Sequence, residues 1–149
     1  MAPELSRYLF LAGAVPYLFL GAAHARATPL RADQRAGLSP ADPELAAAMT
    51  RTWPRLTRRT TMWLTWVGFN LSHSLGALAF GAFVVVIGRS AASYAGQAAA
   101  CAPLATLIAA AYVGLAVKYW FRIPIVGCVA SLVLFASAWA ALLVQAPAP

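Results

Sequence analysis

Hydrophobic residues in this chain gather into four long stretches that contain no charged side chain. The stretches cover residues 8–25, 60–88, 96–117 and 124–145. An α-helix needs about 20 mainly apolar residues to cross the hydrocarbon core of a bilayer. Each stretch is therefore of a length that suits one membrane-spanning helix. The pattern predicts an all-α fold, in which residues 1–149 form a single transmembrane domain built as a four-helix bundle.

A polar connection, residues 26–59, separates the first two stretches and contains seven arginines. Within it, Asp42 is followed by proline and glutamate, which is the pattern of a helix start with Asp42 as the N-cap. Leu45, Met49 and Trp53 would then lie on one face of the helix, four residues apart. The connection is either a short amphipathic helix on the membrane surface, with arginines that contact anionic lipid, or a solvated loop.

The distribution of lysine and arginine predicts the orientation of the chain in the membrane. With four spans, the first and third connections share one side and contain nine of these residues, whereas the other side has only Arg7 and Arg89. Connections rich in lysine and arginine remain in the cytoplasm. We therefore expect a multi-pass protein of a bacterial inner (plasma) membrane, with the connection 26–59 in the cytoplasm and both termini in the periplasm.

The first stretch has one other interpretation, which is a secretory signal peptide cleaved after Ala25. Cleavage would export the arginine-rich connection, against the charge rule. In addition, Glu4 and Pro16 are poor features of a signal peptide. We therefore expect the first stretch to remain in the protein as a span.

Composition narrows the class of protein further. Charged residues make up 10% of the chain, whereas soluble domains contain about 25%. The net charge of +7 indicates topology and contact with anionic membrane lipids, not nucleic-acid binding. Cys101 and Cys128 are expected on the order of 15 Å apart in depth, which excludes a disulfide between them. No charged side chain lies deep in a predicted span, which argues against ion-coupled transport.

The second stretch carries an unusual polar set in its segment GFNLSHSLGALAFG, which consists of Asn70, Ser72, His73 and Ser74. On a helix, Asn70 and His73 are neighbours on the face that also carries Trp63 and Trp66. Both must point into the protein, because lipid cannot satisfy an amide or an imidazole. We predict a polar pocket that opens toward the cytoplasm and contains a neutral His73. Its predicted lining is Trp66, Asn70, His73 and Tyr119, with His24 at the mouth.

Three roles remain open for this polar set. Asn70 and His73 could be structural contacts that hydrogen-bond to other helices. They could instead bind the polar head of a lipid, a quinone or another amphipathic ligand. As a haem or metal site, His73 would pair with His24, but their predicted depths differ by on the order of 10 Å. No carboxylate or thiolate accompanies the two histidines, so we expect no metal and no cofactor.

Two motifs, RRTTMWLTWVGFNLSHSLGALAFG and KYWFRIPIVG, carry a resemblance to known proteins. They resemble an uncharacterised family of small bacterial four-span membrane proteins. That family has a histidine that closes the first span, a Trp-x-x-Trp-x-Gly-Phe-Asn-x-Ser-His-Ser-x-Gly block and a Tyr-Trp-Phe-x-Ile-Pro block. The corresponding positions here are His24, residues 63–76 and residues 119–124. The resemblance implies the four-span fold and marks these residues as candidate sites, without implying a reaction.

These patterns favour a non-catalytic accessory or interaction protein that packs against a larger membrane assembly or against itself. The alternative is a membrane-embedded binding protein or enzyme centred on Asn70 and His73. The expected partners are membrane lipids, with anionic lipid at the basic connection, and a protein partner or a second copy of the chain. The sequence names neither a reaction nor a ligand.

Overall fold

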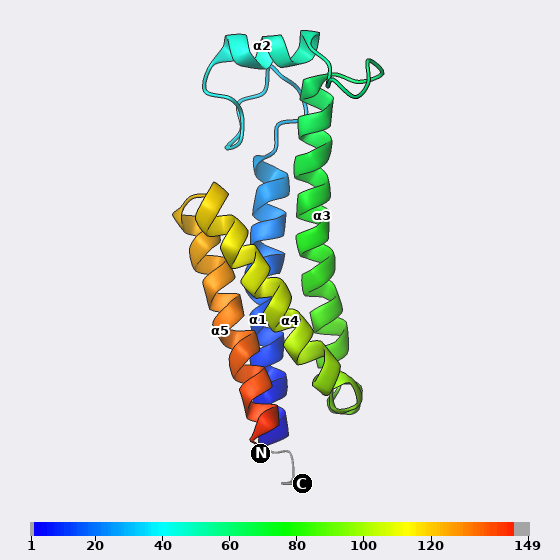
Figure 1. Ribbon diagram of the computed structural model, residues 1–149, viewed down its shortest axis with the longest axis vertical. Coiled ribbons are helices and arrows are strands. Elements are labelled where there is room, and N and C mark those ends of the chain that lie inside the picture. The colour runs from blue at the N-terminus through cyan, green and yellow to red at the C-terminus, as the bar shows by residue number, and fades with distance from the viewer. Residues whose placement is uncertain (1, 145–149) are drawn as a thin grey trace. The chain divides into compact units, whose positions relative to one another are not determined.

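The computed structural model describes residues 2–144, and over this range the chain is helical with no strand (Figure 1). Four helices are long and apolar enough to cross a membrane: α1 (Ala2–Ala27), α3 (Met62–Gly88), α4 (Ala91–Tyr119) and α5 (Arg122–Leu143). A short helix, α2 (Pro43–Arg51), lies in the connection between α1 and α3. The predicted all-α fold with four apolar spans is confirmed. Gln145, the last residue of the predicted fourth span, lies outside the described residues.

The spanning helices do not begin where the apolar stretches begin. α1 starts at Ala2 and not at residue 8, and α4 starts at Ala91 and not at residue 96. Ser90 caps α4, since its hydroxyl accepts a hydrogen bond from the backbone N–H of Ser93 at 3.0 Å. α5 begins at Arg122, so Pro124 lies in its first turn, where a missing N–H breaks no helical hydrogen bond. The Ser90 cap therefore begins α4 before its apolar stretch.

The chain forms two compact units. Unit 1 combines the chain up to Leu20 with the chain from Leu78 onward, and unit 2 is Gly21–Ala77. Unit 1 therefore contains most of α1, the end of α3, and all of α4 and α5. Unit 2 contains the end of α1, the connection with α2, and the start of α3.

Unit 1 is held together at one end by Ser6, near the start of α1. The Ser6 hydroxyl is fully buried and donates to the carbonyl of Ala138 in α5 at 2.7 Å. The Tyr94 hydroxyl at the start of α4 lies 2.7 Å away and therefore donates to Ser6. Arg7 donates from Nη1 to the carbonyl of Gly88, the last residue of α3, at 3.0 Å. The starts of α1 and α4 thus meet the ends of α3 and α5, as alternating up and down helices require.

Farther along unit 1, α1 and α5 pack closely through small residues. The Ser131 hydroxyl donates to the carbonyl of Gly13 at 2.9 Å. A Cβ atom on Gly13 would lie 2.5 Å from the ring of Phe135, so only glycine fits at this position. Gly127, one turn before Ser131, makes room for Leu20, because a Cβ there would lie 2.5 Å from that side chain. The spacing of Gly127 and Ser131 therefore serves the packing of α5 against α1.

An aromatic cluster surrounds Tyr17 in the interior of unit 1. The Tyr17 ring meets the rings of Phe80 and Tyr112 edge-on, with centroid distances of 4.8 Å and 5.3 Å. Its hydroxyl is buried and has no hydrogen-bond partner among the described residues. A buried hydroxyl without a partner has lost its hydration without compensation, which destabilises the fold.

Replacing Tyr17 by phenylalanine should therefore stabilise the protein. The Tyr17→Phe variant keeps the aromatic ring and removes the unpaired hydroxyl, so we expect a gain of about 1 kcal/mol in the free energy of unfolding. The measurement is the thermal unfolding midpoint in a mild detergent, which should rise. Ser131→Ala is the matched control, since it removes a bonded hydroxyl and should lower the midpoint by an amount equivalent to roughly 0.6 kcal/mol. A lower midpoint for Tyr17→Phe would contradict this interpretation.

Candidate functional site

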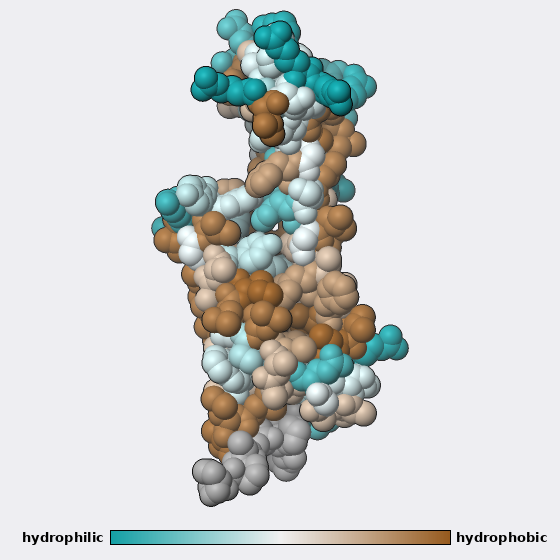
Figure 2. Space-filling model, turned by 45° about the vertical axis from the view of Figure 1, so that its right-hand side comes forward, coloured by the Kyte–Doolittle hydropathy of each residue, from teal (hydrophilic) through white to brown (hydrophobic). Residues whose placement is uncertain are grey.

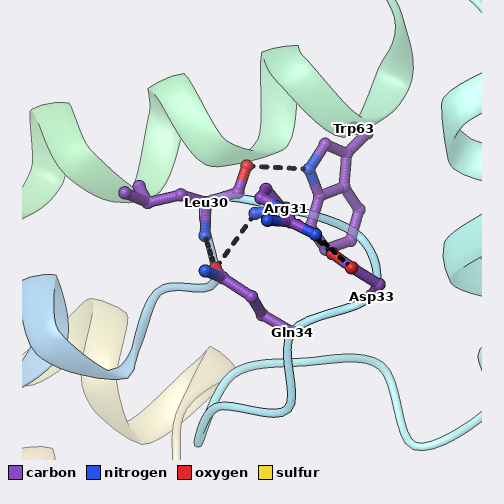
Figure 3. A network of polar contacts seen from close by, with 5 residues as sticks. All are labelled: Leu30, Arg31, Asp33, Gln34 and Trp63. Carbon is purple, nitrogen blue, oxygen red and sulfur yellow. Dashed lines mark hydrogen bonds and ion pairs between the residues drawn. The ribbon is translucent and has the colours of Figure 1, made fainter.

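Unit 2 folds the basic connection onto the first turns of α3. Trp63 is 3% exposed and forms a small core with Ala46 of α2 and Val67 of α3. Met49 packs partly buried against the same core. The indole N–H of Trp63 donates to the carbonyl of Leu30 at 3.4 Å (Figure 3). Trp63 therefore fixes both α2 and the chain after α1 to the start of α3.

The helix start predicted at Asp42 is confirmed, but the predicted apolar stripe is wrong at its last residue. The Asp42 carboxylate accepts the backbone N–H two residues on at 2.8 Å, as an N-cap does. The helix ends at Arg51, so Trp53 lies outside it. Trp53 precedes Pro54, and a residue before proline is disfavoured in the helical conformation. Met49 faces the Trp63 core, so it does not form a membrane-facing stripe with Trp53.

A local network orders the chain between α1 and α2 (Figure 3). The Gln34 side-chain oxygen accepts the backbone N–H groups of Leu30 and Arg31 at 2.8 Å and 3.1 Å. The Arg31 guanidinium forms an ion pair with Asp33. Hydrogen bonds from this guanidinium hold the pKa of the Asp33 carboxyl below its usual range. These contacts, although exposed, give the chain between α1 and α2 a defined turn.

One member of the polar set of α3, Asn70, forms a direct hydrogen bond with His24 of α1. His24 Nε2 lies 2.9 Å from Asn70 Oδ1, while Asn70 Nδ2 donates to the carbonyl of Trp66 at 2.8 Å. The second bond fixes the orientation of the amide, so Oδ1 is the acceptor and His24 carries a proton on Nε2. Ser74 donates to the carbonyl of Asn70 at 3.0 Å. Asn70 is 7% exposed and serves as a bridge between the two helices.

His73 lies against His24, and this proximity corrects the predicted difference in their depths. The centroids of the two rings are 5.0 Å apart, and the rings meet edge to face. The estimate of on the order of 10 Å assumed that α3 and α1 meet the membrane surface at the same level. Instead, His24 is paired with Asn70, so the eight residues from Met62 to Phe69, a rise of about 12 Å, precede the level of His24. The first turns of α3 pack against the connection in place of α1.

The geometry of the two histidines does not suit the axial ligands of one haem. Such ligands hold the iron from opposite faces of a flat macrocycle. The edge contact of His24 with His73 leaves no space for that plane, and His24 Nε2 is occupied by Asn70. Among the described residues, no three His, Cys, Asp or Glu side chains are grouped as metal ligands. The pair is better described as a ring contact between two helices, beside the hydrogen bond that joins His24 to Asn70.

The other predicted site residues differ in their surroundings. Ser74 is 1% exposed, whereas Ser72 is exposed and donates to a carbonyl of its own helix at 2.9 Å. Trp66 is half-buried, with its ring centroid 5.4 Å from that of Trp63. Tyr119, at the end of α4, belongs to unit 1 and is 67% exposed, so a pocket that includes it stays a prediction. The predicted residues that unit 2 brings together are His24, Trp66, Asn70, His73 and Ser74.

A hollow of about 320 Å³ lies elsewhere in unit 2, between α2 and the turn that precedes it. Its lining includes Arg35, Ser39 and Pro43. Sequence reasoning missed it, because the hollow depends on how the turn folds and not on any local motif. The polar partners of Ser6 were missed for a similar reason, since a lone serine near the end of a span gives no signal of what it will meet.

No family model, curated protein or solved structure matches the chain. The resemblance to small four-span bacterial membrane proteins therefore stays a prediction that rests on the two motifs. Function is accordingly inferred from the contacts within this chain.

Replacing Asn70 by leucine should destabilise the protein, because it removes the bridge between His24 and α3. We expect a loss of about 1 kcal/mol in the free energy of unfolding, the usual size of one hydrogen bond between membrane helices. The measurement is the thermal unfolding midpoint in mild detergent. Thr50→Ala is the control, since that hydroxyl is exposed and bonds only to a carbonyl of its own helix α2, and it should change stability by less than about 0.5 kcal/mol. An Asn70→Leu variant as stable as the wild type would show that the bond does not hold the helices together.

Proposed function

We propose that the protein is a non-catalytic membrane protein that acts by associating with a second copy of itself through helix α3. The use of its polar residues supports a structural role. Asn70 bridges two helices, Ser6 connects α1 to α4 and α5, and Ser131 joins α5 to α1. These side chains form hydrogen bonds within the fold itself, as polar side chains between membrane helices do.

The observation that carries this proposal is an open face on α3 formed by Gly68, Ser72 and Gly76, the α3 small face. The three residues lie four positions apart and are all exposed. A Cβ atom on Gly68 or Gly76 would meet nothing within 4 Å. By contrast, a Cβ on Gly81 or Gly88 would lie 2.7 Å from leucine side chains of α1. The later glycines of α3 serve packing inside the chain, whereas the α3 small face is open to a helix of another chain.

A second copy of α3 fits this face for geometric reasons. Small residues four positions apart allow two membrane helices to approach until their backbones are in contact. When both partners present the same patch, a two-fold axis makes the surface complementary to itself. Ser72, at the centre of the face, places its hydroxyl oxygen where the partner helix crosses. The proposed dimer is therefore a symmetric crossing of two α3 helices.

Filling the α3 small face should break the dimer. In the double variant Gly68→Ile with Gly76→Ile, the new side chains extend into open space, so the monomer remains folded while the helices are held apart. We expect the dissociation constant to rise at least about tenfold, equivalent to roughly 1.4 kcal/mol. The measurement is molar mass by light scattering in mild detergent over a range of protein concentrations.

The control is Gly96→Ile with Gly114→Ile on α4, where a Cβ also meets nothing within 4 Å. This variant should dimerise as the wild type does. A monomeric wild type would contradict self-association. If that monomer instead co-purifies with another membrane protein, and the α3 double variant loses it, the face belongs to a larger assembly.

A second candidate function, a membrane-embedded binding protein, is favoured by the contact between His24 and His73. Two imidazoles in contact beside the Asn70 amide form a polar cluster within a span, and imidazole is a group that hydrogen-bonds the polar head of a quinone or lipid. Mass spectrometry of the purified wild-type protein separates the two candidates. A bound small molecule present in a fixed ratio to the protein would favour this second candidate.

We further propose that the protein resides in a bacterial inner membrane, with the connection between α1 and α3 in the cytoplasm and both termini in the periplasm. The imbalance of nine basic residues against two supports this orientation. The meeting of the start of α1 with the end of α5 at Ser6 supports a common side for both termini.

Reporter fusions test this orientation directly. A reporter that works only in the periplasm should be active when fused after Gln145. One that works only in the cytoplasm should be active when inserted at Gly37, which is exposed in the connection. The reverse pattern of activity would contradict the proposed topology.

A further inference from the structure

The segment from the last residue of α2 onward, residues 51–59, has the most concentrated positive charge in the chain. Its sequence RTWPRLTRR contains four arginines and no acid. All four arginines are exposed. Among the described residues the ion pairs are Arg7 with Glu4 and Arg31 with Asp33, so none involves this segment. Its positive charge is therefore available to an external anion.

Two large apolar side chains stand among these arginines. Leu56 is 95% exposed and Trp53 is 48% exposed. The guanidinium carbon of Arg58 lies 5.0 Å from the centre of the Trp53 ring. Figure 2 shows hydrophilic surface gathered over the region where Figure 1 places α2, with apolar atoms among it. Tryptophan and arginine together suit the headgroup layer of a bilayer, where the ring is partly buried and the guanidinium bonds phosphate.

The backbone shapes this part of the chain into a closed loop at the start of α3. The N–H of Met62 donates to the carbonyl of Thr52 at 2.8 Å and joins the two ends of the loop. Thr52 is extended, with φ −110° and ψ 149°, which directs the chain away from α2. A turn closed by the N–H of Thr57 and the carbonyl of Pro54 forms the tip. Residues 52–62, here called the anchor loop, are thus fixed beside the end of a membrane-spanning helix.

We propose that the anchor loop binds the anionic phospholipid headgroups of the leaflet at which α3 begins. Trp53 and Leu56 enter the headgroup layer, while Arg55, Arg58 and Arg59 donate hydrogen bonds to lipid phosphates. The bilayer is the partner because its negative surface complements three arginines, and because the loop is joined directly to a span. The loop, and not the helix α2, makes this contact, since Met49 of α2 faces the Trp63 core.

Fluorescence of Trp53 in vesicles tests this proposal on the full chain. The wild type and Trp53→Phe are reconstituted in phosphatidylcholine alone, or in equimolar phosphatidylcholine and phosphatidylglycerol. The difference between their emission spectra isolates Trp53 and leaves the buried Trp63 in place. In vesicles that contain phosphatidylglycerol, we expect the Trp53 emission to shift to the blue and its quenching by acrylamide to fall several-fold. Equal quenching in the two kinds of vesicle would overturn the proposal.

A charge variant identifies the source of the preference. The variant combines Arg55→Gln, Arg58→Gln and Arg59→Gln. Its preference for binding the loop to anionic vesicles over neutral ones should fall on the order of a hundredfold. Acrylamide access to Trp53 should then be the same in both lipids. The matched control removes three arginines from the same connection outside the loop, at Arg26, Arg31 and Arg35, and should keep the wild-type shielding.

Two further outcomes would also overturn the proposal. If the loop variant keeps full shielding in anionic vesicles, Trp53 inserts through apolar contact alone. If both triple variants lose shielding equally, the effect belongs to the net charge of the connection and not to the anchor loop. Circular dichroism confirms that each variant is folded. If a variant fails to fold, the comparison of wild-type Trp53 quenching in the two kinds of vesicle still tests the proposal.

Discussion

Hydrocarbon offers no hydrogen-bond partner, so a polar group in a span destabilises the protein unless another part of the chain satisfies it. The packing of both units depends on this constraint. In unit 1, Ser6 joins the start of α1 to α4 and α5, and Ser131 reaches the carbonyl of Gly13. In unit 2, Asn70 joins α3 to His24. Ser6, Ser131 and Asn70 thus set the register of helix pairs that apolar contacts alone would allow to slide.

The spans could be predicted from the sequence because bilayer thickness sets their length and the absence of charge sets their position. The start of α2 was equally predictable, since an N-cap such as Asp42 is a local feature. The beginning of α1 was not, because it depends on distant parts of the chain. Arg7 is tolerated within the helix since it pairs with Glu4 and reaches the carbonyl of Gly88. Glu4 is a local partner, but no local pattern reveals the carbonyl of Gly88, which lies 81 positions away.

The sequence predicted which polar residues form the candidate site, but not which residues of α3 lie against His24 of α1. Burial of Asn70 follows from the properties of an amide in lipid, and the residue is 7% exposed. The contact between His24 and His73 was not foreseen, because depth was counted from the first residue of each apolar stretch. Packing of Trp63 on Ala46 uses the first turns of α3 to hold the connection, so Asn70, and not an earlier residue of α3, lies against His24. Pro54 similarly removes Trp53 from a helix that periodicity alone would extend.

The Ser6 contacts also have a consequence for biosynthesis. The hydroxyl of Ser6 and its acceptor on Ala138 are separated by 132 residues. At a synthesis rate of 5–20 residues per second, roughly 7 to 26 seconds pass between the appearance of one group and that of the other. During this interval the partners of α1 on α3 and α4, which are the carbonyl of Gly88 and the hydroxyl of Tyr94, are made before the partner on α5. The contact of α1 with α5 is thus the last of these contacts to form, and the Ser6 hydroxyl lacks its acceptor until Ala138 has been made.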